Sequence, residues 1–272
     1  MLTIGWFSTG RDEAARQLLQ VVYERIQRGE IDGEIAFVFS NQEPSESRES
    51  DLFFEMVYNY HIPLICFSSL KFKATQDVIT TTEDGKLPQW RLEYDREIMK
   101  KLQRYTPDIC ILAGYMLIVE KEMCHRYNLL NLHPAAPHGP KGSWQEVTWA
   151  LIESKSKESG VMMHLVTPEL DRGPVITYCT FPIAGEPFDK YWQEIENYSI
   201  AKLKKEQGEN NALFRLIRQH ELVREFPLIV STLKTLSQRK IKVKDGNIFN
   251  SHGKVITGYN LNNKINKMVG IK

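Results

Sequence analysis

The chain is poor in cysteine, and this scarcity bounds the environment in which it is expected to work. Its 272 residues include only 4 cysteines, which are scattered without a close pair. Cys66, Cys110 and Cys179 lie in apolar runs, where a thiol behaves as a small buried hydrophobe. We therefore expect free thiols in a reducing compartment, which is typical of a cytoplasmic protein.

Long hydrophobic runs, repeats and an excess of one charge are also missing. No uncharged run approaches the roughly 18 residues that a transmembrane helix needs, and the N-terminus lacks the basic region that opens a signal peptide. The 35 basic and 34 acidic residues leave a formal net charge of +1. This balance argues against a general nucleic-acid or membrane-surface binder, so neither partner is expected.

Short apolar runs alternate with amphipathic runs over the first half of the chain. The patterns predict strands at 2–8, 34–41, 62–68, 108–114 and 128–133, and helices at 12–29, 49–60, 92–105 and 120–127. Near-continuous apolar strands that alternate with helices form parallel sheets covered on both faces. The expected fold class is therefore α/β, with three layers and a mostly parallel twisted sheet between helices.

The second half of the chain predicts an antiparallel addition to that sheet. After a helix at 145–154, strands at 160–168 and 174–183 are separated by a turn of five residues, which favours a hairpin. A helix at 212–238 is expected to break or kink near Pro227, and Asp245-Gly246 predicts a final hairpin. We divide the chain into a catalytic core at 1–183, a charged insertion at 184–212, and a C-terminal helix and β-hairpin at 213–272 that pack on the same domain.

The stretch "LLNLHPAAP" places two polar side chains at the end of an apolar strand. Asn131 and His133 are two residues apart, so they share one face of the strand, and open α/β sheets place ligands at the carboxyl ends of strands. Asp171 lies in the predicted hairpin turn. An amide, an imidazole and a carboxylate suit the attack of an amine on a carbonyl, with the amide stabilising the oxyanion and the other two moving or holding a proton. A nearby carboxylate should favour the protonated imidazole.

A structural explanation competes with this one. A lone histidine in an apolar strand is more often a satisfied core residue, and Asp-x-Gly is ordinary turn chemistry. Asn131 and His133 together before a proline make the two explanations about equal. The other histidines show no ligand spacing, and His138, near His133, has no third partner, so no metal site is expected.

Two longer motifs of the sequence resemble motifs of a known protein family. "NLLNLHPAAP" and "GVMMHLVTPELDRGPVI" resemble the folate-dependent formyltransferase family, in which an Asn-x-His-Pro strand end is followed by a Thr-x-Glu-Leu-Asp-x-Gly-Pro loop. "VFSN" (38–41) and "LAGYM" (112–116) also resemble family strand ends. The resemblance covers 1–183, "FPLIV" (226–230) and the last hairpin. It implies the formyltransferase fold and direct formyl transfer from 10-formyltetrahydrofolate to a primary amine, with no metal. The best expected acceptor is glycinamide ribonucleotide of purine biosynthesis.

The resemblance also implies roles for individual residues. Asn131 and His133 would stabilise the tetrahedral oxyanion, and Asp171 would hold the histidine and a water that relays the proton. The pteridine of the folate would lie beside 112–119 and pair with backbone groups there, although the family often has arginine where this chain has Leu117. The expected folate-binding residues are Ala113, Gly114, Tyr115, Met116, Leu117, Ile118, Val166, Thr167 and Leu170.

The acceptor side departs most from the family pattern. The family grips a phosphate with a Ser-Gly-x-Gly-Ser-Asn-like loop at a helix N-terminus, whereas this chain has "FSTGRDEAAR", in which Asp12 either competes with a phosphate or simply begins the helix. The family glutamate that contacts the ribose falls at Leu222, with Glu221 beside it. The expected acceptor-binding residues are Ser8, Thr9, Gly10, Arg11, Pro134 and Glu221. Trp144 is interpreted equally as a packing residue or a substrate platform, and Lys141 as solvated.

Four alternatives are considered. One is a binding or regulatory protein that kept the fold and lost the reaction, although the presence of Asn131, His133 and Asp171 argues against it. The acceptor could be a different amine such as an amino sugar, or the formyl group could pass to water. Hydrolases of this kind usually carry a further N-terminal domain, whereas this chain begins with the first strand, so hydrolysis is less expected. Formyl transfer to methionyl-tRNA would call for a larger basic C-terminal domain than the tail provides.

Overall fold

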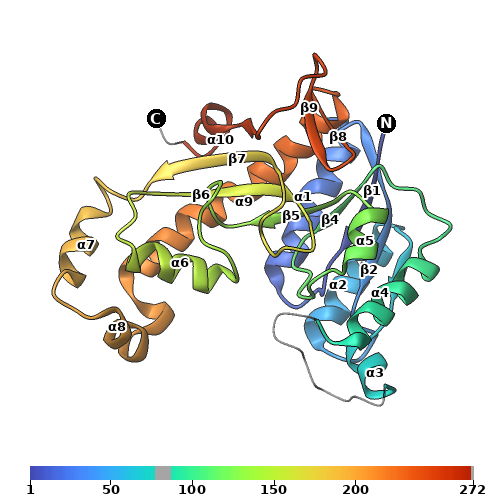
Figure 1. Ribbon diagram of the computed structural model, residues 1–272, viewed down its shortest axis with the longest axis horizontal. Helices are drawn as coiled ribbons and strands as arrows, with labels where there is room; N and C mark the ends of the chain where they lie inside the picture. The colour runs from blue at the N-terminus through green and yellow to red at the C-terminus, as the bar shows by residue number, and fades with distance from the viewer. Residues whose placement is uncertain (77–86, 271–272) are drawn as a thin grey trace.

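The computed structural model describes residues 1–76 and 87–270, and its centre is an eight-stranded sheet. The strand order is β10-β7-β6-β5-β4-β1-β2-β3 (Figure 1). Strands β1 and β2 pair in parallel, as do β1 and β4, β2 and β3, β4 and β5, and β7 and β10. The strands are β1 (Leu2–Phe7), β2 (Gly33–Ser40), β3 (Leu64–Cys66), β4 (Ile109–Leu112), β5 (Leu129–His133), β6 (Glu158–Leu165), β7 (Val175–Pro182) and β10 (Tyr259–Asn260).

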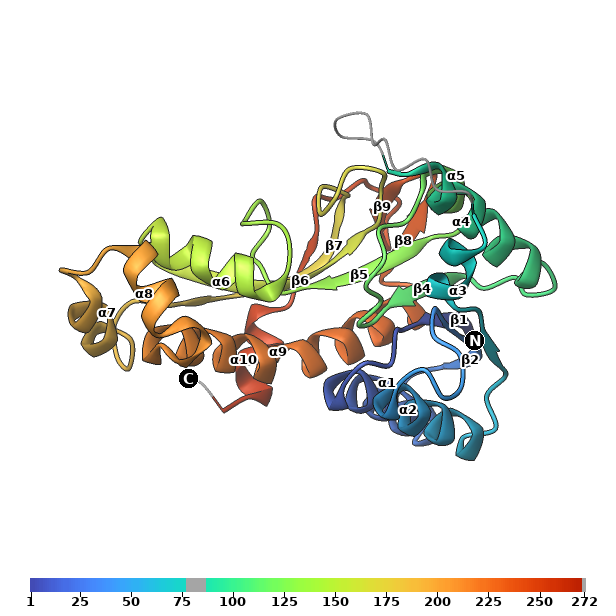
Figure 2. The same cartoon turned by 90° about the horizontal axis from the view of Figure 1, so that it is seen from below.

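Helices cover both faces of the sheet, so the predicted three-layer α/β fold is confirmed. On one side lie α1 (Glu13–Gln27), α2 (Arg48–Asn59), α9 (Ala212–Ser237) and α10 (Asn262–Met268); on the other lie α4 (Gln89–Lys101) and α5 (Lys121–Arg126) (Figure 2). Neighbouring strand residues point to opposite layers: Trp6 joins the core with α1, α2 and α9, whereas Phe7 joins the core with α4 and α5.

The predicted hairpin of β6 and β7 is confirmed, and β6 also pairs antiparallel with β5. Strand β6 is thus the one strand of the described sheet that runs against its neighbours. In this register the end of β6, Leu165, lies opposite Leu130 near the start of β5. The β6–β7 loop then folds back, so that Asp171 lies near His133 at the carboxyl end of β5. The final hairpin is confirmed as well: β8 (Ile241–Lys244) and β9 (Asn247–Asn250) flank Asp245 and Gly246, both with positive φ.

Of the break or kink expected near Pro227, the break is wrong, because α9 runs from Ala212 to Ser237 with Pro227 inside it. Proline removes one backbone hydrogen bond from a helix interior. Residues on both sides of it, including Arg224 and Leu228, are fully buried, and α9 contacts α1, β6 and β7. Packing along the helix therefore outweighs the local penalty.

The segment 184–212 has structure of its own at one end of the molecule (Figure 1). It contains α7 (Asp189–Ile195), α8 (Ile200–Glu206) and the short helix η1 (Gly208–Asn210). Phe188 and Leu203 are buried in one cluster with residues of α6 (Trp144–Glu153) and the start of α9, so the segment predicted as a charged insertion packs against the rest of the protein. The helix α3 (Ser69–Ala74), β10 and α10 were not predicted. No described helix is long and apolar enough to cross a membrane.

Candidate active site

The carboxyl end of β5 carries Asn131 and His133 on one face, as the two-residue spacing predicts. In the antiparallel register of β6, His164 lies directly opposite Asn131, and directly opposed residues share a face. The Asn131 Nδ2 atom is 3.2 Å from His164 Nε2. His164 is therefore a site residue that the sequence analysis missed, and the β5–β6 pairing is the observation that would have revealed it.

The β6–β7 loop brings Asp171 to the same place. Its Oδ1 atom is 3.5 Å from His164 Nε2 and its Oδ2 atom is 3.8 Å from His133 Nδ1. The backbone N–H of Gly142 donates to Asp171 Oδ2 at 3.0 Å, which ties this loop to the loop after β5. Asp171 adopts a φ of 51°, a conformation that aspartate tolerates better than most residues. The structure thus brings the three predicted catalytic residues together and adds a second histidine.

Carbonyl acceptors determine which ring nitrogens carry protons. His133 Nε2 lies 2.9 Å from Pro140 O, and His164 Nδ1 lies 3.0 Å from Leu165 O. Since a carbonyl oxygen only accepts, both nitrogens donate. In a neutral His164 the Nε2 atom is then free to accept from the Asn131 amide, whereas protonation turns the same atom toward donation to Asp171.

The expectation of a protonated His133 is not supported. Burial lowers the pKa of His133, and this effect outweighs the opposing influence of the Pro140 carbonyl and the Asp171 carboxylate. The imidazole is only 2% exposed, and the carboxylate is beyond hydrogen-bonding distance. Burial alone would raise the pKa of Asp171, but the contacts with His164, His133 and Gly142 together lower it. The site at neutral pH therefore pairs a neutral His133 with an ionised Asp171.

These side chains open onto a cleft of about 710 Å³, within the usual size range of small-molecule sites. One wall is the irregular segment between β4 and α5, and another is the β6–β7 loop. Ala113 does not line the cleft. This residue is fully buried in the core, so the prediction that its side chain contacts the folate is wrong. The other predicted folate-binding residues do line the cleft: Gly114, Tyr115, Met116, Leu117, Ile118, Val166, Thr167 and Leu170.

Only some of the residues predicted to bind the amine acceptor line the cleft. Arg11 and Pro134 line it, but Ser8, Thr9 and Gly10 do not. Ser8 Oγ accepts the N–H of Gly10 at 3.1 Å, and Thr9 Oγ1 donates to Asn41 Oδ1 at 2.8 Å. These groups are therefore already bonded within the protein, and the predicted contacts of Ser8, Thr9 and Gly10 with the acceptor are corrected.

The N-terminus of α1 is capped by its own chain. The Asp12 side chain accepts the N–H of Ala15 at 2.9 Å, so Asp12 begins the helix as one interpretation predicted. Asp12 and Glu13 both line the cleft. Their carboxylates occupy the positive end of the helix dipole, where a phosphate would otherwise be stabilised.

The prediction that Glu221 contacts the acceptor is also wrong. Glu221 is fully buried, does not line the cleft, and accepts a hydrogen bond from Ser159 Oγ at 2.9 Å. Burial raises its pKa to about 8. Arg218, Leu222 and Glu225 line the cleft instead, at the i, i+4, i+7 spacing of one helix face. That periodicity was visible in the sequence, but which face meets the cleft was not.

Trp144 packs against neighbouring side chains and also lines the cleft, so its role as a substrate platform stays a prediction. It is the first residue of α6 and lines the cleft, with the Arg218 guanidinium 4.9 Å and the Phe214 ring 5.8 Å from its ring. Lys141 is exposed and lies outside the cleft lining, as expected.

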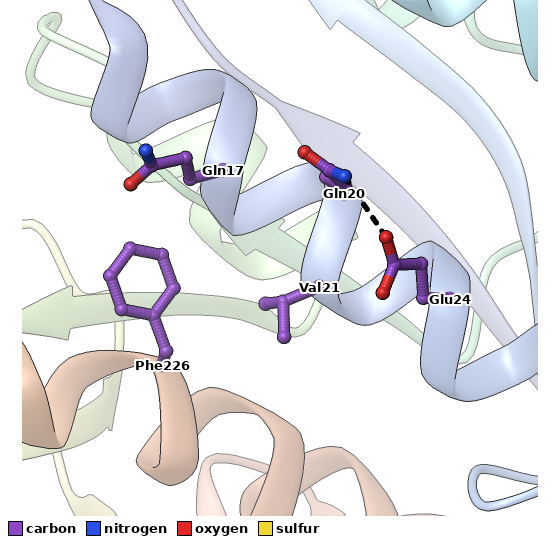
Figure 3. A pocket seen from close by; sticks show the side chains of 5 residues that line it. All are labelled: Gln17, Gln20, Val21, Glu24 and Phe226. Carbon is purple, nitrogen blue, oxygen red and sulfur yellow. Dashed lines mark hydrogen bonds between the residues drawn. The ribbon is translucent and has the colours of Figure 1, made fainter.

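A second hollow of about 290 Å³ lies between α1 and α9 (Figure 3). It is lined by Gln17, Gln20, Val21, Glu24 and Phe226, and Gln20 Nε2 donates to Glu24 Oε1 at 2.9 Å. It contains no histidine, cysteine or lysine, so it offers no acid–base pair. Among the described residues no group of three or more histidine, cysteine or acidic side chains is placed to hold a metal.

The fold and the cleft define a class of protein. An open α/β sheet carries an amide, two imidazoles and a carboxylate at the carboxyl edge of its central strands, beside a cleft of small-molecule size. This arrangement is suited to proton transfer and to attack on a carbonyl.

Comparison with known proteins identifies the family within that class. A family model described as formyl transferase matches residues 13–205, and the chain belongs to the formyl transferase family. Over 131 residues it is 33% identical to phosphoribosylglycinamide formyltransferase of Escherichia coli (strain K12), covering 47% of this chain and 58% of that protein. Over 91 residues it is 33% identical to formyltetrahydrofolate deformylase of Haemophilus influenzae, covering 32% of this chain and 31% of that protein.

A solved structure supports the fold over nearly the whole length. Phosphoribosylglycinamide formyltransferase from Coxiella burnetii matches with a TM-score of 0.66 at 18% identity, covering 95% of this chain and 98% of that chain. In sequence, the alignments span about half the length of the curated phosphoribosylglycinamide formyltransferases of Escherichia coli and Haemophilus influenzae, 58% and 45%.

Proposed function

We propose that the protein transfers a formyl group from 10-formyltetrahydrofolate to a primary amine, and that glycinamide ribonucleotide is the acceptor. The convergence of Asn131, His133 and Asp171 on the wall of the cleft carries this proposal. The names of the relatives support the acceptor. The apolar wall at 114–119 and residues of the β6–β7 loop both line the cleft, which supports the binding of a folate there.

The side chains suit each stage of the transfer. As the amine nitrogen bonds to the formyl carbon, negative charge develops on the formyl oxygen, and the Asn131 amide is a donor that can stabilise it. The amine then loses a proton while the leaving nitrogen of the folate gains one. The ionised Asp171, directly or through water, is the acceptor for the first proton. The neutral His133 is suited to passing a proton onward.

The direct test is incubation of the purified chain with 10-formyltetrahydrofolate and glycinamide ribonucleotide. We expect tetrahydrofolate and the formylated ribonucleotide to appear in equal amounts. A reaction without amine measures transfer to water, the activity in the name of the deformylase relative. Turnover that is as fast without amine would contradict the transferase proposal.

Asp171→Asn tests the placement of the site. This variant keeps the shape of the side chain and loses its charge, so we expect turnover to fall by about 10²-fold or more while the circular dichroism spectrum stays unchanged. Glu169→Gln, in the same loop, is the control and should retain activity. Full activity in Asp171→Asn would show that the proton acceptor lies elsewhere.

A second candidate keeps the chemistry and changes the acceptor to an amine without a phosphate, such as an amino sugar. The observation that favours it is the N-terminus of α1, where Asp12 and Glu13 face the cleft and the Gly10 N–H is already bonded. A screen of phosphorylated and unphosphorylated amines separates the two candidates. Inorganic phosphate should inhibit competitively only if a phosphate site exists.

A further inference from the structure

The loop between β5 and α6 bonds two of the three predicted catalytic residues through its backbone. His133 Nε2 donates to Pro140 O at 2.9 Å, and the Gly142 N–H donates to Asp171 Oδ2 at 3.0 Å. Both backbone groups belong to residues 140–143, which we call the 140–143 segment; it is neither helix nor strand. Side chains of a site keep their geometry only if the groups that bond them are themselves held. The bonds that hold the 140–143 segment therefore affect the geometry of the site.

A capping box connects the 140–143 segment to α6. The Ser143 N–H and hydroxyl donate to Glu146 Oε2 at 2.7 and 2.8 Å, and Ser143 Oγ accepts the Glu146 N–H at 3.3 Å. Two consecutive backbone N–H groups, those of Gly142 and Ser143, are thus each bonded to a carboxylate. One carboxylate is Asp171 of the β6–β7 loop and the other is Glu146 of α6. A capping box ordinarily does no more than begin a helix, whereas this one extends into the site.

Glycine at position 142 leaves the space that the Glu146 carboxylate occupies. Gly142 has a φ of 98°, in the region that favours glycine. A Cβ atom at this position would lie 2.4 Å from Glu146 Oε2. The carboxylate therefore packs against the 140–143 segment as well as bonding it.

The charge of Glu146 strengthens this connection. The Ser143 N–H and hydroxyl lower the pKa of Glu146, so its carboxylate is ionised at neutral pH, and a negative charge in the first turn of a helix is favoured by the helix dipole. Glu146 also lines the cleft. Within the described part of the chain, its carboxylate bonds Ser143 and none of the predicted catalytic residues. Any effect on Asp171 is therefore transmitted through the 140–143 segment.

We propose that Glu146 is a positioning residue for Asp171: it holds the 140–143 segment at the start of α6, so that the Gly142 N–H stays on the Asp171 carboxylate. The same connection keeps the Pro140 carbonyl on His133. The inference rests on the proposed function only for the identity of the reaction. It assigns no contact between Glu146 and the reacting atoms.

The experiment compares Glu146→Ala and Glu146→Gln with the wild-type protein. Two readouts need no substrate: hydrogen exchange of the Gly142 amide, and titration of the Asp171 carboxyl by carbon NMR. Glu146→Ala releases the Ser143 N–H, so we expect faster exchange at Gly142. We also expect a higher pKa of Asp171, because the Gly142 N–H bonds its ionised form and lowers that pKa. Glu146→Gln keeps an oxygen that can accept from Ser143 and should recover part of both effects.

Turnover supplies a third readout. We expect kcat of Glu146→Ala to fall by about three- to tenfold, which is the size of change that the loss of one helix cap can produce. Glu146→Gln should lie between this variant and the wild-type protein.

Ser47→Ala is the matched control. Ser47 caps α2 by accepting the Ser50 N–H at 3.1 Å, and it does not line the cleft. This variant removes a helix cap that has no bond to the 140–143 segment. We expect wild-type exchange at Gly142, wild-type titration of Asp171 and wild-type kcat. Equal changes in Ser47→Ala and Glu146→Ala, or wild-type exchange and titration in a folded Glu146→Ala, would overturn the inference.

Two further provisions keep the test decisive. If Glu146→Ala does not fold, Glu146→Asp keeps the charge but shortens the side chain by one methylene group, which withdraws the carboxylate from the Ser143 N–H. Unchanged Gly142 exchange and Asp171 titration in that variant would overturn the inference. If the wild-type protein does not transfer the formyl group, the proposed function fails. Faster Gly142 exchange and a raised pKa of Asp171 in Glu146→Ala would in that case still support the positioning role.

Discussion

At the level of single residues, His164 has two polar partners on one ring nitrogen. Asn131 Nδ2 is 3.2 Å and Asp171 Oδ1 is 3.5 Å from His164 Nε2. The ring is buried, and its other nitrogen is bonded to Leu165 O. His164 is therefore placed to hold the Asn131 amide and the Asp171 carboxylate in their working orientations.

Replacing His164 by alanine should lower kcat by about 10- to 100-fold, less than the roughly 10²- to 10⁴-fold that a general acid–base supplies. The reason is that Asn131 and Asp171 remain but lose their common partner. Steady-state kinetics with saturating substrates measure the effect, and the exposed His252→Ala serves as control. A loss as large as that of Asp171→Asn would mean that His164 itself moves the proton.

The pH dependence of kcat/KM follows from the lowered pKa values of His133 and Asp171. Since burial puts the pKa of His133 below its ordinary value of 6.5, the neutral imidazole persists at pH 7. Asp171, whose pKa lies below 3.8, is ionised there too. Both groups therefore gain protons only below their ordinary pKa values, so the acid limb should lie below pH 6.5. A limb centred above that value would indicate that the carboxylate dominates over burial.

At the level of elements, the β6–β7 loop depends on one glycine. A Cβ atom on Gly173 would lie 1.6 Å from the carbonyl oxygen of Leu165. That backbone atom cannot move aside cheaply, because the Leu165 N–H is bonded to Pro174 O at 2.9 Å. The close approach positions the loop that carries Asp171.

Gly173→Ala should therefore reduce both stability and activity. We expect a loss of about 1–3 kcal/mol in the free energy of unfolding and a fall in kcat, because the loop must shift to accept the methyl group. Urea denaturation and kinetics measure the two effects. The neighbouring Arg172→Ala, an exposed position, is the control. Unchanged kcat in Gly173→Ala would show that Asp171 does not depend on this part of the loop.

Elements whose character is set by local pattern were predicted well, and those set by packing were not. The strands of the first half and both hairpins follow from apolar runs and turn residues. In contrast, the continuity of α9 through Pro227 depends on burial along its whole length. The short strand β10 pairs with β7 through contacts far apart in sequence, which no local pattern contains.

At the level of the whole molecule, α9 connects the C-terminal part of the chain to the sheet. It contacts α1, α6, α10, β6 and β7, and its face at Arg218, Leu222 and Glu225 also lines the cleft. These contacts support our proposal that 213–272 packs on the same domain as 1–183. The division at 184–212 stays a prediction.

Glu221, a fully buried residue of this helix, should affect the global stability of the protein. The pKa of Glu221 is raised from 4.5 to about 8, so the folded state keeps a proton that the unfolded chain releases above pH 4.5. The stabilising contribution is complete below pH 4.5 and is lost as the pH rises through about 8. Glu221→Gln can still accept from Ser159 but cannot ionise. At pH 8 it should exceed the wild-type free energy of unfolding by roughly 2–5 kcal/mol, because each pKa unit of the shift corresponds to about 1.4 kcal/mol.

Urea denaturation at pH 5 and pH 8 checks this expectation, with the exposed Glu153→Gln as control. The gain over the wild-type protein should be larger at pH 8 than at pH 5. An equal pH dependence in Glu221→Gln and the wild-type protein would show that Glu221 is ionised in the folded state.

The sequence by itself determined the α/β class, the hairpins and the shared face of Asn131 and His133, because strand periodicity and turn chemistry act over a few neighbouring residues. Only the tertiary structure decided that His164 completes the group, that Glu221 is buried and Glu225 faces the cleft, and that Ser8 and Thr9 bond within the protein. These outcomes depend on strand register and on which face of a helix meets the sheet. Both are set by contacts between residues far apart in the chain.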